Sequence, residues 1–220
     1  QQIPAGRRFE VLVVCSGNIC RSPMGEQVLR RAFAEAGLGE AVTVSSAGTG
    51  DWHVGQGAHP PARRILADAG YPTAHAARQV TRAMVNASDL VLAADRGHLR
   101  ALRDVATDPS RVHLVRSFDP DADHDEVPDP YGHPDEQYRE VLAMLRAAAP
   151  GVVNEVRSRI GCLTRSSPWA IHRTAAHPAR IIRHHRRLRH RWAALTPRSR
   201  HRQALPPSPR HRRRSTPCVS

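Results

Sequence analysis

The residues best suited to chemistry stand close together in one segment, CSGNICRS at positions 15–22. A cysteine thiolate is a strong nucleophile. Six residues later, Arg21 offers planar paired N–H donors that match two oxygens of an oxyanion such as phosphate. The backbone N–H groups of residues 16–21 would bind the same anion if the loop turned them into one concavity. We therefore expect Cys15 to face a phosphate-like group held by Arg21.

A strand before this segment and a helix after it would position the loop. Residues 9–14 form a nearly continuous apolar run, which is typical of a buried parallel strand. Ser22 followed by Pro23 predicts a helix N-cap with proline at the first helical position. Apolar residues then recur at helical spacing as far as Gly37, the expected stop. The positive end of the helix dipole would stabilise both the anion and the Cys15 thiolate.

Context makes this segment more specific than its two key residues alone. A Cys-x5-Arg pattern is common by chance in a chain with 33 Arg and four Cys. Gly17 and Asn18 tolerate the left-handed backbone that a tight loop requires. The alternative interpretation is a structural thiol at Cys15 and a surface charge at Arg21. The strand, loop and helix together favour the phosphate site.

The segment from Cys15 to Pro23 resembles the signature loop of the low-molecular-weight protein tyrosine phosphatases, and the bacterial members most closely. Three further blocks resemble the same family in the same order, from about residue 9 to about residue 160. These are Ser45–Thr49 with Trp52–Gly55, then Thr73–Val80, then Asp129–Gly132.

The resemblance implies hydrolysis of phosphotyrosine and small aryl phosphates. Cys15 would attack phosphorus to form a phosphocysteine, and Arg21 with the loop N–H groups would stabilise the transition state. Asp129 would act as general acid and then as general base. The alternative for Asp129 before Pro130 is a turn opener. No cofactor or metal is implied, because the loop itself supplies the positive field.

Further residues follow from the same resemblance. The remaining loop residues would bind substrate, and Ser22 would also donate a hydrogen bond to the Cys15 sulfur. Asn18 would help Ser46 and His75 to hold the loop in shape. The cleft walls would stack on an aromatic substrate. The substrate-binding set is Ser16, Gly17, Asn18, Ile19, Cys20, Ser22, Trp52, His53 and Tyr131.

Two positions in these blocks carry separate expectations. Many members of the family have two tyrosines after Asp-Pro, whereas this chain has Tyr131 and Gly132, so half of an aromatic wall is missing. Cys20 suggests a reversible disulfide with Cys15 that protects the nucleophile from over-oxidation. A small apolar filler is the alternative for Cys20.

The order of strand-like and helix-like segments predicts an α/β fold. After the first strand, strands are expected at 42–46, 89–93 and 112–115, and helices at 60–70, 96–105 and 135–159. The last helix should break at Pro150-Gly151. Such alternation predicts a three-layer sandwich, with a four-stranded parallel sheet between helices on both faces. Asp95 follows the third strand at the edge where ligands bind, either ordering a loop or lying at the surface.

Charge divides the chain in two. Residues 1–161 carry 18 Arg and all 20 acidic residues, whereas residues 162–220 carry 15 Arg, no Asp and no Glu. We expect 1–161 to be one phosphatase-like domain and 162–220 a disordered basic tail. The tail could bind nucleic acid or anionic lipid, but an unselected extension accounts better for its composition. We expect a monomer that acts on phosphotyrosine-containing proteins.

Two other functions stay open. An arsenate reductase on the same fold would need further cysteines to relay a disulfide, and none lies between Cys20 and Cys162. A non-catalytic protein that binds phosphate or nucleic acid through the tail is the second. The cysteine pattern resembles neither a disulfide framework nor a zinc site, and no signal peptide or membrane span is visible. We expect a cytoplasmic protein, with export without a signal peptide as the alternative.

Overall fold

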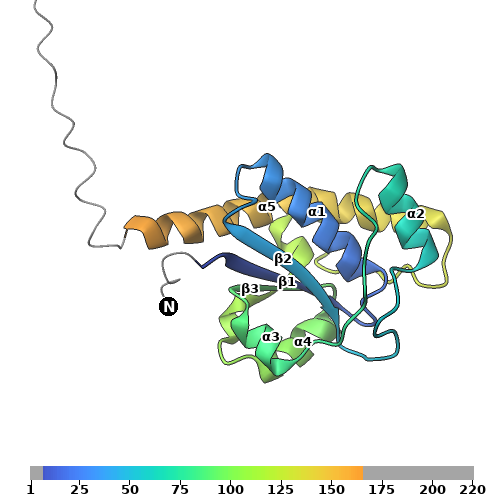
Figure 1. The fold of residues 1–220 in the computed structure, drawn as a ribbon, viewed down its shortest axis with the longest axis horizontal. Coiled ribbons are helices and arrows are strands. Elements are labelled where there is room, and N and C mark those ends of the chain that lie inside the picture. The colour runs from blue at the N-terminus through green and yellow to red at the C-terminus, as the bar shows by residue number, and fades with distance from the viewer. Residues whose placement is uncertain (1–6, 166–220) are drawn as a thin grey trace, which may run out of the picture. The chain divides into compact units, whose positions relative to one another are not determined.

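A four-stranded parallel sheet forms the centre of the molecule in the computed structural model, which describes residues 7–165 (Figure 1). The strand order is β2-β1-β3-β4, with β1 at Phe9–Cys15, β2 at Val42–Gly48, β3 at Leu90–Ala93 and β4 at Val112–Leu114. The α-helices are α1 at Arg21–Glu35, α2 at Pro60–Asp68, α3 at Arg82–Ala87, α4 at Arg96–Val105 and α5 at Asp135–Arg165.

Helices cover both faces of this sheet, so the predicted three-layer α/β sandwich is confirmed. Alternate residues of β1 explain the two layers, because side chains of a strand point to opposite faces in turn. Val11 and Val13 pack with α1, α2 and α5 in one core. Leu12 and Val14 pack with α3 and α4 in a second core. The loop after β1 therefore starts from a strand that is held on both faces.

The start of α1 differs from the prediction. Ser22 is not the N-cap, because the helix begins at Arg21 and follows Cys20, which makes no side-chain capping bond. The Ser22 hydroxyl instead lies 3.0 Å from the Cys15 sulfur. At the other end, Gly37 adopts a left-handed φ of 72° just after the helix, as expected.

The predicted break at Pro150-Gly151 is wrong, since α5 runs through both residues to Arg165. Proline inside a helix costs roughly 3 kcal/mol. The apolar face of α5, including Val152 and Val156, is fully buried and offsets that cost. Gly151 allows α5 to pack closely against the backbone at Phe118, because a Cβ on Gly151 would lie 1.9 Å from the Phe118 carbonyl oxygen.

The short helix α3 was not predicted, and the domain boundary expected at residue 161 falls inside α5. The expectations for the basic tail concern residues outside the described ones, apart from the end of α5.

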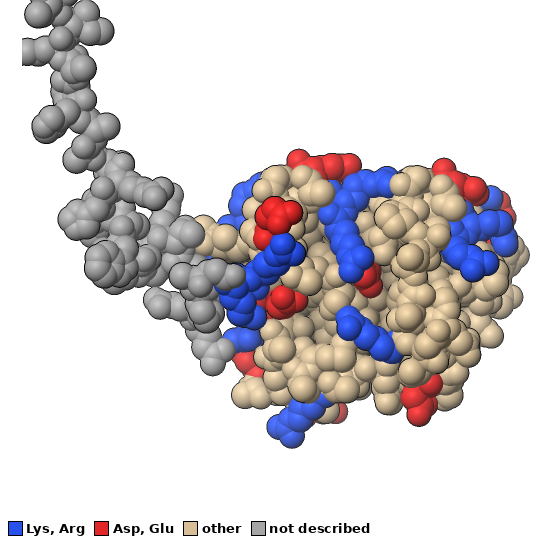
Figure 2. Space-filling model, viewed as in Figure 1, with Lys and Arg blue, Asp and Glu red and all other residues tan. Residues whose placement is uncertain are grey.

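On the face seen in Figure 2, acidic and basic side chains of the described residues are interspersed among uncharged ones. Across residues 7–165, no helix is both long and apolar enough to cross a membrane.

Candidate active site

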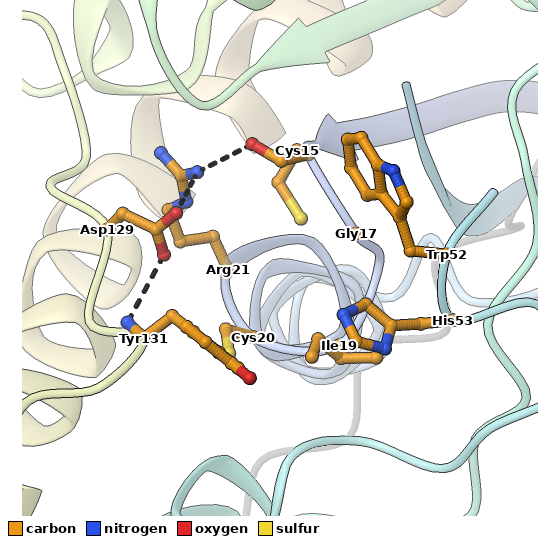
Figure 3. A pocket seen from close by; sticks show the side chains of 10 residues that line it. Cys15, Gly17, Ile19, Cys20, Arg21, Trp52, His53, Asp129 and Tyr131 are labelled. Atoms are coloured by element: carbon orange, nitrogen blue, oxygen red, sulfur yellow. Dashed lines mark hydrogen bonds and ion pairs between the residues drawn. The ribbon is translucent and has the colours of Figure 1, made fainter. Parts of the chain in front are cut away.

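The loop between β1 and α1 forms one wall of a pocket of about 190 Å³ at the carboxyl edge of the sheet (Figure 3). This is the edge at which open α/β sheets bind ligands. Segments far apart in the sequence complete the pocket. It is lined by Cys15, Ser16, Gly17, Ile19, Cys20, Arg21, Trp52, His53, Asp129 and Tyr131.

The end of β2 lies directly against the loop. Thr49 N donates to the Cys15 carbonyl oxygen at 2.9 Å, and Gly50 N donates to the Ser16 carbonyl oxygen at 2.9 Å. A Cβ on Gly48 would lie 2.6 Å from the Ser16 oxygen and 2.9 Å from the Asn18 nitrogen. Only glycine therefore permits this approach of two backbones.

Of the two residues expected in left-handed backbone, Asn18 has a φ of 54° and Gly17 is not left-handed. Gly17 has a different role, because a Cβ there would lie 2.8 Å from Cδ2 of His53. The space above Gly17 is thus occupied by the ring of a pocket residue.

The side chain of Asn18 is fully buried behind the loop, on the side away from the pocket. Its Nδ2 donates to Ser22 Oγ and to Ser46 Oγ, both at 2.9 Å, and its Oδ1 accepts from the Arg78 amide at 2.9 Å. His75 Nε2 donates to the Asn18 carbonyl oxygen at 2.6 Å. These four contacts fix the loop from behind.

Two further residues complete this buried network: Glu26, which the sequence did not indicate, and Arg78, which lies in the Thr73–Val80 block of the sequence analysis. Glu26 accepts from Ser46 Oγ at 2.5 Å and pairs with Arg30 at 2.6 Å. Arg78 donates from Nε to the Ser46 carbonyl oxygen at 2.8 Å. Glu26 lies on the buried side of α1, one turn after Ser22. A carboxylate on the apolar face of the predicted helix was the sequence signal that could have identified it.

Cys15 is buried at the base of the pocket. Its Sγ lies 3.0 Å from Ser22 Oγ. Since Ser22 Oγ already accepts from Asn18, the Ser22 hydroxyl hydrogen is available to the sulfur.

Cys20 is also buried, and burial raises the pKa of its thiol to about 12. Its sulfur lies 3.9 Å from the Tyr138 hydroxyl, which in turn lies 2.8 Å from His59 Nδ1. Neither Tyr138 nor His59 was predicted. Their signal is weak, because an aromatic residue on α5 and a histidine before α2 read as ordinary packing.

The Arg21 guanidinium has partners from several elements. Its Nη2 donates to Asp129 Oδ2 at 2.8 Å and to Ser16 Oγ at 3.2 Å. Its Nη1 donates to Asp95 Oδ2 at 3.0 Å and to the Val127 carbonyl oxygen at 3.2 Å. The guanidinium is therefore fixed in orientation at the pocket wall, as Figure 3 shows for its contact with Asp129.

The pocket opening is aromatic and exposed. Trp52 and Tyr131 are 67% and 55% exposed, and His53 lines the same pocket. The Tyr131 ring centroid lies 6.5 Å from that of His53 and 5.0 Å from that of His59. Asp129 reaches the opening beside Tyr131, whose amide donates to Asp129 Oδ1 at 3.3 Å. Such an opening favours a flat aromatic group.

Asp95 lies against the pocket loop, so of the two alternatives that the sequence left, a surface aspartate is wrong. Its Oδ1 caps α4 by accepting from the His98 amide at 2.9 Å, while its Oδ2 pairs with Arg21. Burial alone would raise the pKa of Asp95, but His98 and Arg21 outweigh burial and lower it. His98 itself was not predicted, although it stands three residues after Asp95 on the first turn of α4.

The comparisons with known proteins agree with this geometry. A family model described as "Low molecular weight phosphotyrosine protein phosphatase" matches residues 10–160. A low molecular weight protein-tyrosine-phosphatase of Streptomyces coelicolor is 48% identical over 158 residues, which cover 69% of this chain and 96% of that protein. Low molecular weight protein-tyrosine phosphatase A of Mycobacterium tuberculosis is 44% identical over 162 residues, covering 73% and 97%.

A solved structure shows the same likeness in three dimensions. The crystal structure of YfkJ from Bacillus subtilis aligns with a TM-score of 0.66 and 31% sequence identity, covering 70% of this chain and 98% of that one.

Proposed function

Because the chain belongs to the low molecular weight phosphotyrosine protein phosphatase family, it is a phosphoric monoester hydrolase, and we propose a phosphocysteine mechanism for it. The observation that carries the proposal is one pocket in which Cys15, Arg21 and Asp129 meet. These groups correspond to a nucleophile, an anion binder and a separate proton donor.

In the first step, Cys15 Sγ attacks phosphorus and the bond from phosphorus to the leaving oxygen breaks. Arg21 and the N–H groups of residues 16–21 bind the equatorial oxygens, where negative charge is spread in the transition state. Asp129 gives its proton to the departing phenolate oxygen. Its half-exposed side chain stands at the pocket opening on a segment of its own, within reach of Arg21, which supports this assignment.

In the second step, Asp129 takes a proton from water, and the water oxygen attacks the phosphocysteine. The phosphorus–sulfur bond breaks, and the sulfur leaves as a thiolate that accepts the Ser22 hydrogen bond. The buried network behind Asn18 keeps the loop amides aligned through both steps. Preorganised donors of this kind need no rearrangement when charge develops.

We infer that the substrates are phosphotyrosine-containing proteins. Cys15 lies at the base of the pocket and the exposed rings of Trp52 and Tyr131 stand at its opening. An aryl ring can span that depth with its faces against these rings, whereas the shorter phosphoserine side chain cannot. All ten lining residues belong to residues 7–165, so we propose that this part suffices for hydrolysis.

The test is hydrolysis of p-nitrophenyl phosphate in the presence of EDTA by the full chain and by a chain that ends after Arg165. We expect both to turn over. Cys15→Ser should abolish the rate, and Asp129→Ala should lower kcat by about 10²-fold or more, the usual size of general-acid catalysis. An inactive parent, or full activity in Cys15→Ser, contradicts the mechanism.

A further inference from the structure

Four side chains form a closed ring of contacts at one edge of the pocket. Arg21 Nη2 donates to Ser16 Oγ at 3.2 Å, and Ser16 Oγ lies 2.9 Å from His98 Nε2. His98 Nδ1 lies 2.9 Å from Asp95 Oδ2, off the line of an ideal hydrogen bond. Arg21 Nη1 donates to Asp95 Oδ2 at 3.0 Å, and this contact closes the ring. The ring ties the phosphate-binding arginine to α4.

The chemistry of these groups fixes the position of each hydrogen. The guanidinium can only donate, so Ser16 Oγ and Asp95 Oδ2 are its acceptors. The Asp95 carboxylate favours the neutral His98 tautomer with its hydrogen on Nδ1. Nε2 then carries a lone pair, and the Ser16 hydroxyl must donate to it. Neutral His98 therefore accepts from Ser16, and its Nδ1 hydrogen faces the Asp95 carboxylate without a hydrogen bond of good geometry.

The charged groups around His98 oppose one another. Asp95 and Arg21 contact or adjoin it, and Asp129 and Glu126 approach from the segment before α5. Burial lowers the pKa of His98 below its ordinary value, and Arg21 acts in the same direction, while the three carboxylates act against them. The side chain of His98 is 7% exposed, so water stabilises its charged form only weakly.

We propose that His98 is a positioning residue for the phosphatase reaction: in its neutral form it holds Ser16 and Asp95, and through them it aims the Arg21 guanidinium into the pocket. This inference rests on the proposed function, because Arg21 must bind the phosphoryl group. His98 touches no substrate, since it does not line the pocket.

Protonation of His98 changes the ring. Nε2 then donates to Ser16 Oγ, and the Ser16 hydroxyl hydrogen must turn away from the histidine. Ser16 Oγ now receives donors from both His98 and Arg21, and a second cation stands beside the guanidinium. The contacts that hold Arg21 are weakened, so phosphate binding should fall as His98 becomes charged.

The experiment compares kcat/KM for p-nitrophenyl phosphate between pH 5 and 7.5 in the full chain and in His98→Ala. At pH 7.5 we expect the variant to be about 10-fold slower, which is the effect of one such hydrogen bond on a rate. At pH 5 the difference should shrink towards 1, because protonated parent has already lost the same contact. KM and the inhibition constant of inorganic phosphate should rise with the loss.

Three variants separate positioning from folding. His98→Gln, whose amide can still accept from Ser16, should recover part of the rate. Ser16→Ala removes the hydroxyl alone, and in the Ser16→Ala/His98→Ala double variant the two losses should not add, because they break the same ring. His113→Gln is the matched control, since burial also lowers the pKa of this half-buried histidine outside the pocket. It should leave the profile unchanged.

Each outcome decides one point. A parent with no turnover overturns the proposed function, and an NMR titration of the His98 ring with and without inorganic phosphate then still tests the ring. A parent that turns over, with a His98→Ala loss that is equal at every pH and fully additive with Ser16→Ala, overturns the positioning role alone. A loss of folded protein without a change in KM would do the same.

Discussion

The two sides of the loop after β1 differ in exposure to solvent and in hydrogen bonding. On the pocket side, Arg21 contacts two carboxylates, of which the Asp129 side chain is 49% exposed. Behind the loop, Asn18 and Ser46 are buried. Asn18 bonds to neutral groups, whereas Ser46 donates to the buried Glu26 carboxylate. The pocket side is charged and open to solvent, whereas the back is buried and nearly saturated with hydrogen bonds.

This difference shows how one short segment combines rigidity with changeable partners. In the proposed mechanism, Arg21 must release Asp129 or share it when an anion enters, and water can solvate the half-exposed Asp129 carboxylate as it separates. Buried hydrogen bonds do not exchange cheaply, because each group left without a partner costs about 1–3 kcal/mol. We therefore expect changes on the pocket side to affect rate and changes behind the loop to affect stability.

The largest expected effect is that of Arg21→Lys on rate. An ammonium cannot reach Asp95, Ser16 and the anion together as the planar guanidinium does. We expect kcat/KM for p-nitrophenyl phosphate to fall by about 10²–10³, as for loss of one oxyanion donor, with little change in thermal unfolding. Arg64→Lys, an exposed arginine paired with Asp135, is the control and should change the rate less than about 2-fold. A large fall in the melting temperature of Arg21→Lys would contradict the expectation that changes on the pocket side affect rate and not stability.

The matching change behind the loop is Asn18→Ala. It removes two donors and one acceptor, leaving Ser46, Ser22 and the Arg78 amide without that partner. We expect the free energy of unfolding in urea to fall by about 3 kcal/mol, near 1 kcal/mol for each bond. Asn86→Ala, which removes one acceptor from the Thr107 amide, should cost about 1 kcal/mol. Equal losses in the two variants would contradict the comparison.

Two glycines test the sides with the same added methyl group. In Gly48→Ala the new Cβ meets loop backbone at 2.6 Å, which cannot move without distorting the site. We expect a loss of about 1–3 kcal/mol in stability together with a slower rate. In Gly17→Ala the Cβ meets the His53 ring at 2.8 Å, and this side chain can rotate away. Its stability should change by less than about 1 kcal/mol, so the order of the two urea midpoints is the measurement.

The smallest expected effect is on the pH dependence of stability. Because the pKa of His98 is lowered on folding, the unfolded chain binds more protons below the ordinary histidine pKa of about 6.5. The stability of the parent is thus complete above that pH and falls as pH decreases towards 5. In His98→Gln this decrease should be smaller, by about 1.4 kcal/mol for each unit of difference in pKa. His133→Gln, at an exposed position, should keep the parental slope in thermal unfolding.

The sequence predicted the elements whose signals are local. The apolar run of β1, the helical spacing of α1 and the stop at Gly37 are properties of neighbouring residues, and the structure agrees with them. The N-cap preference of Ser22 yields to its contact with Cys15, and the helix-breaking preference of the exposed Pro150 yields to the burial of Val152 and Val156 on the same helix. Local propensity is a weak guide wherever long-range packing is strong.

The sequence by itself determined that Cys15 and Arg21 share one loop between a strand and a helix, since these residues lie only six positions apart in the chain. Only the tertiary structure decided what surrounds them. Asp95 and His98 reach Arg21 and Ser16 across more than 70 residues, because parallel β1 and β3 end at the same edge of the sheet. No spacing in the sequence records that meeting, which depends on strand order and register.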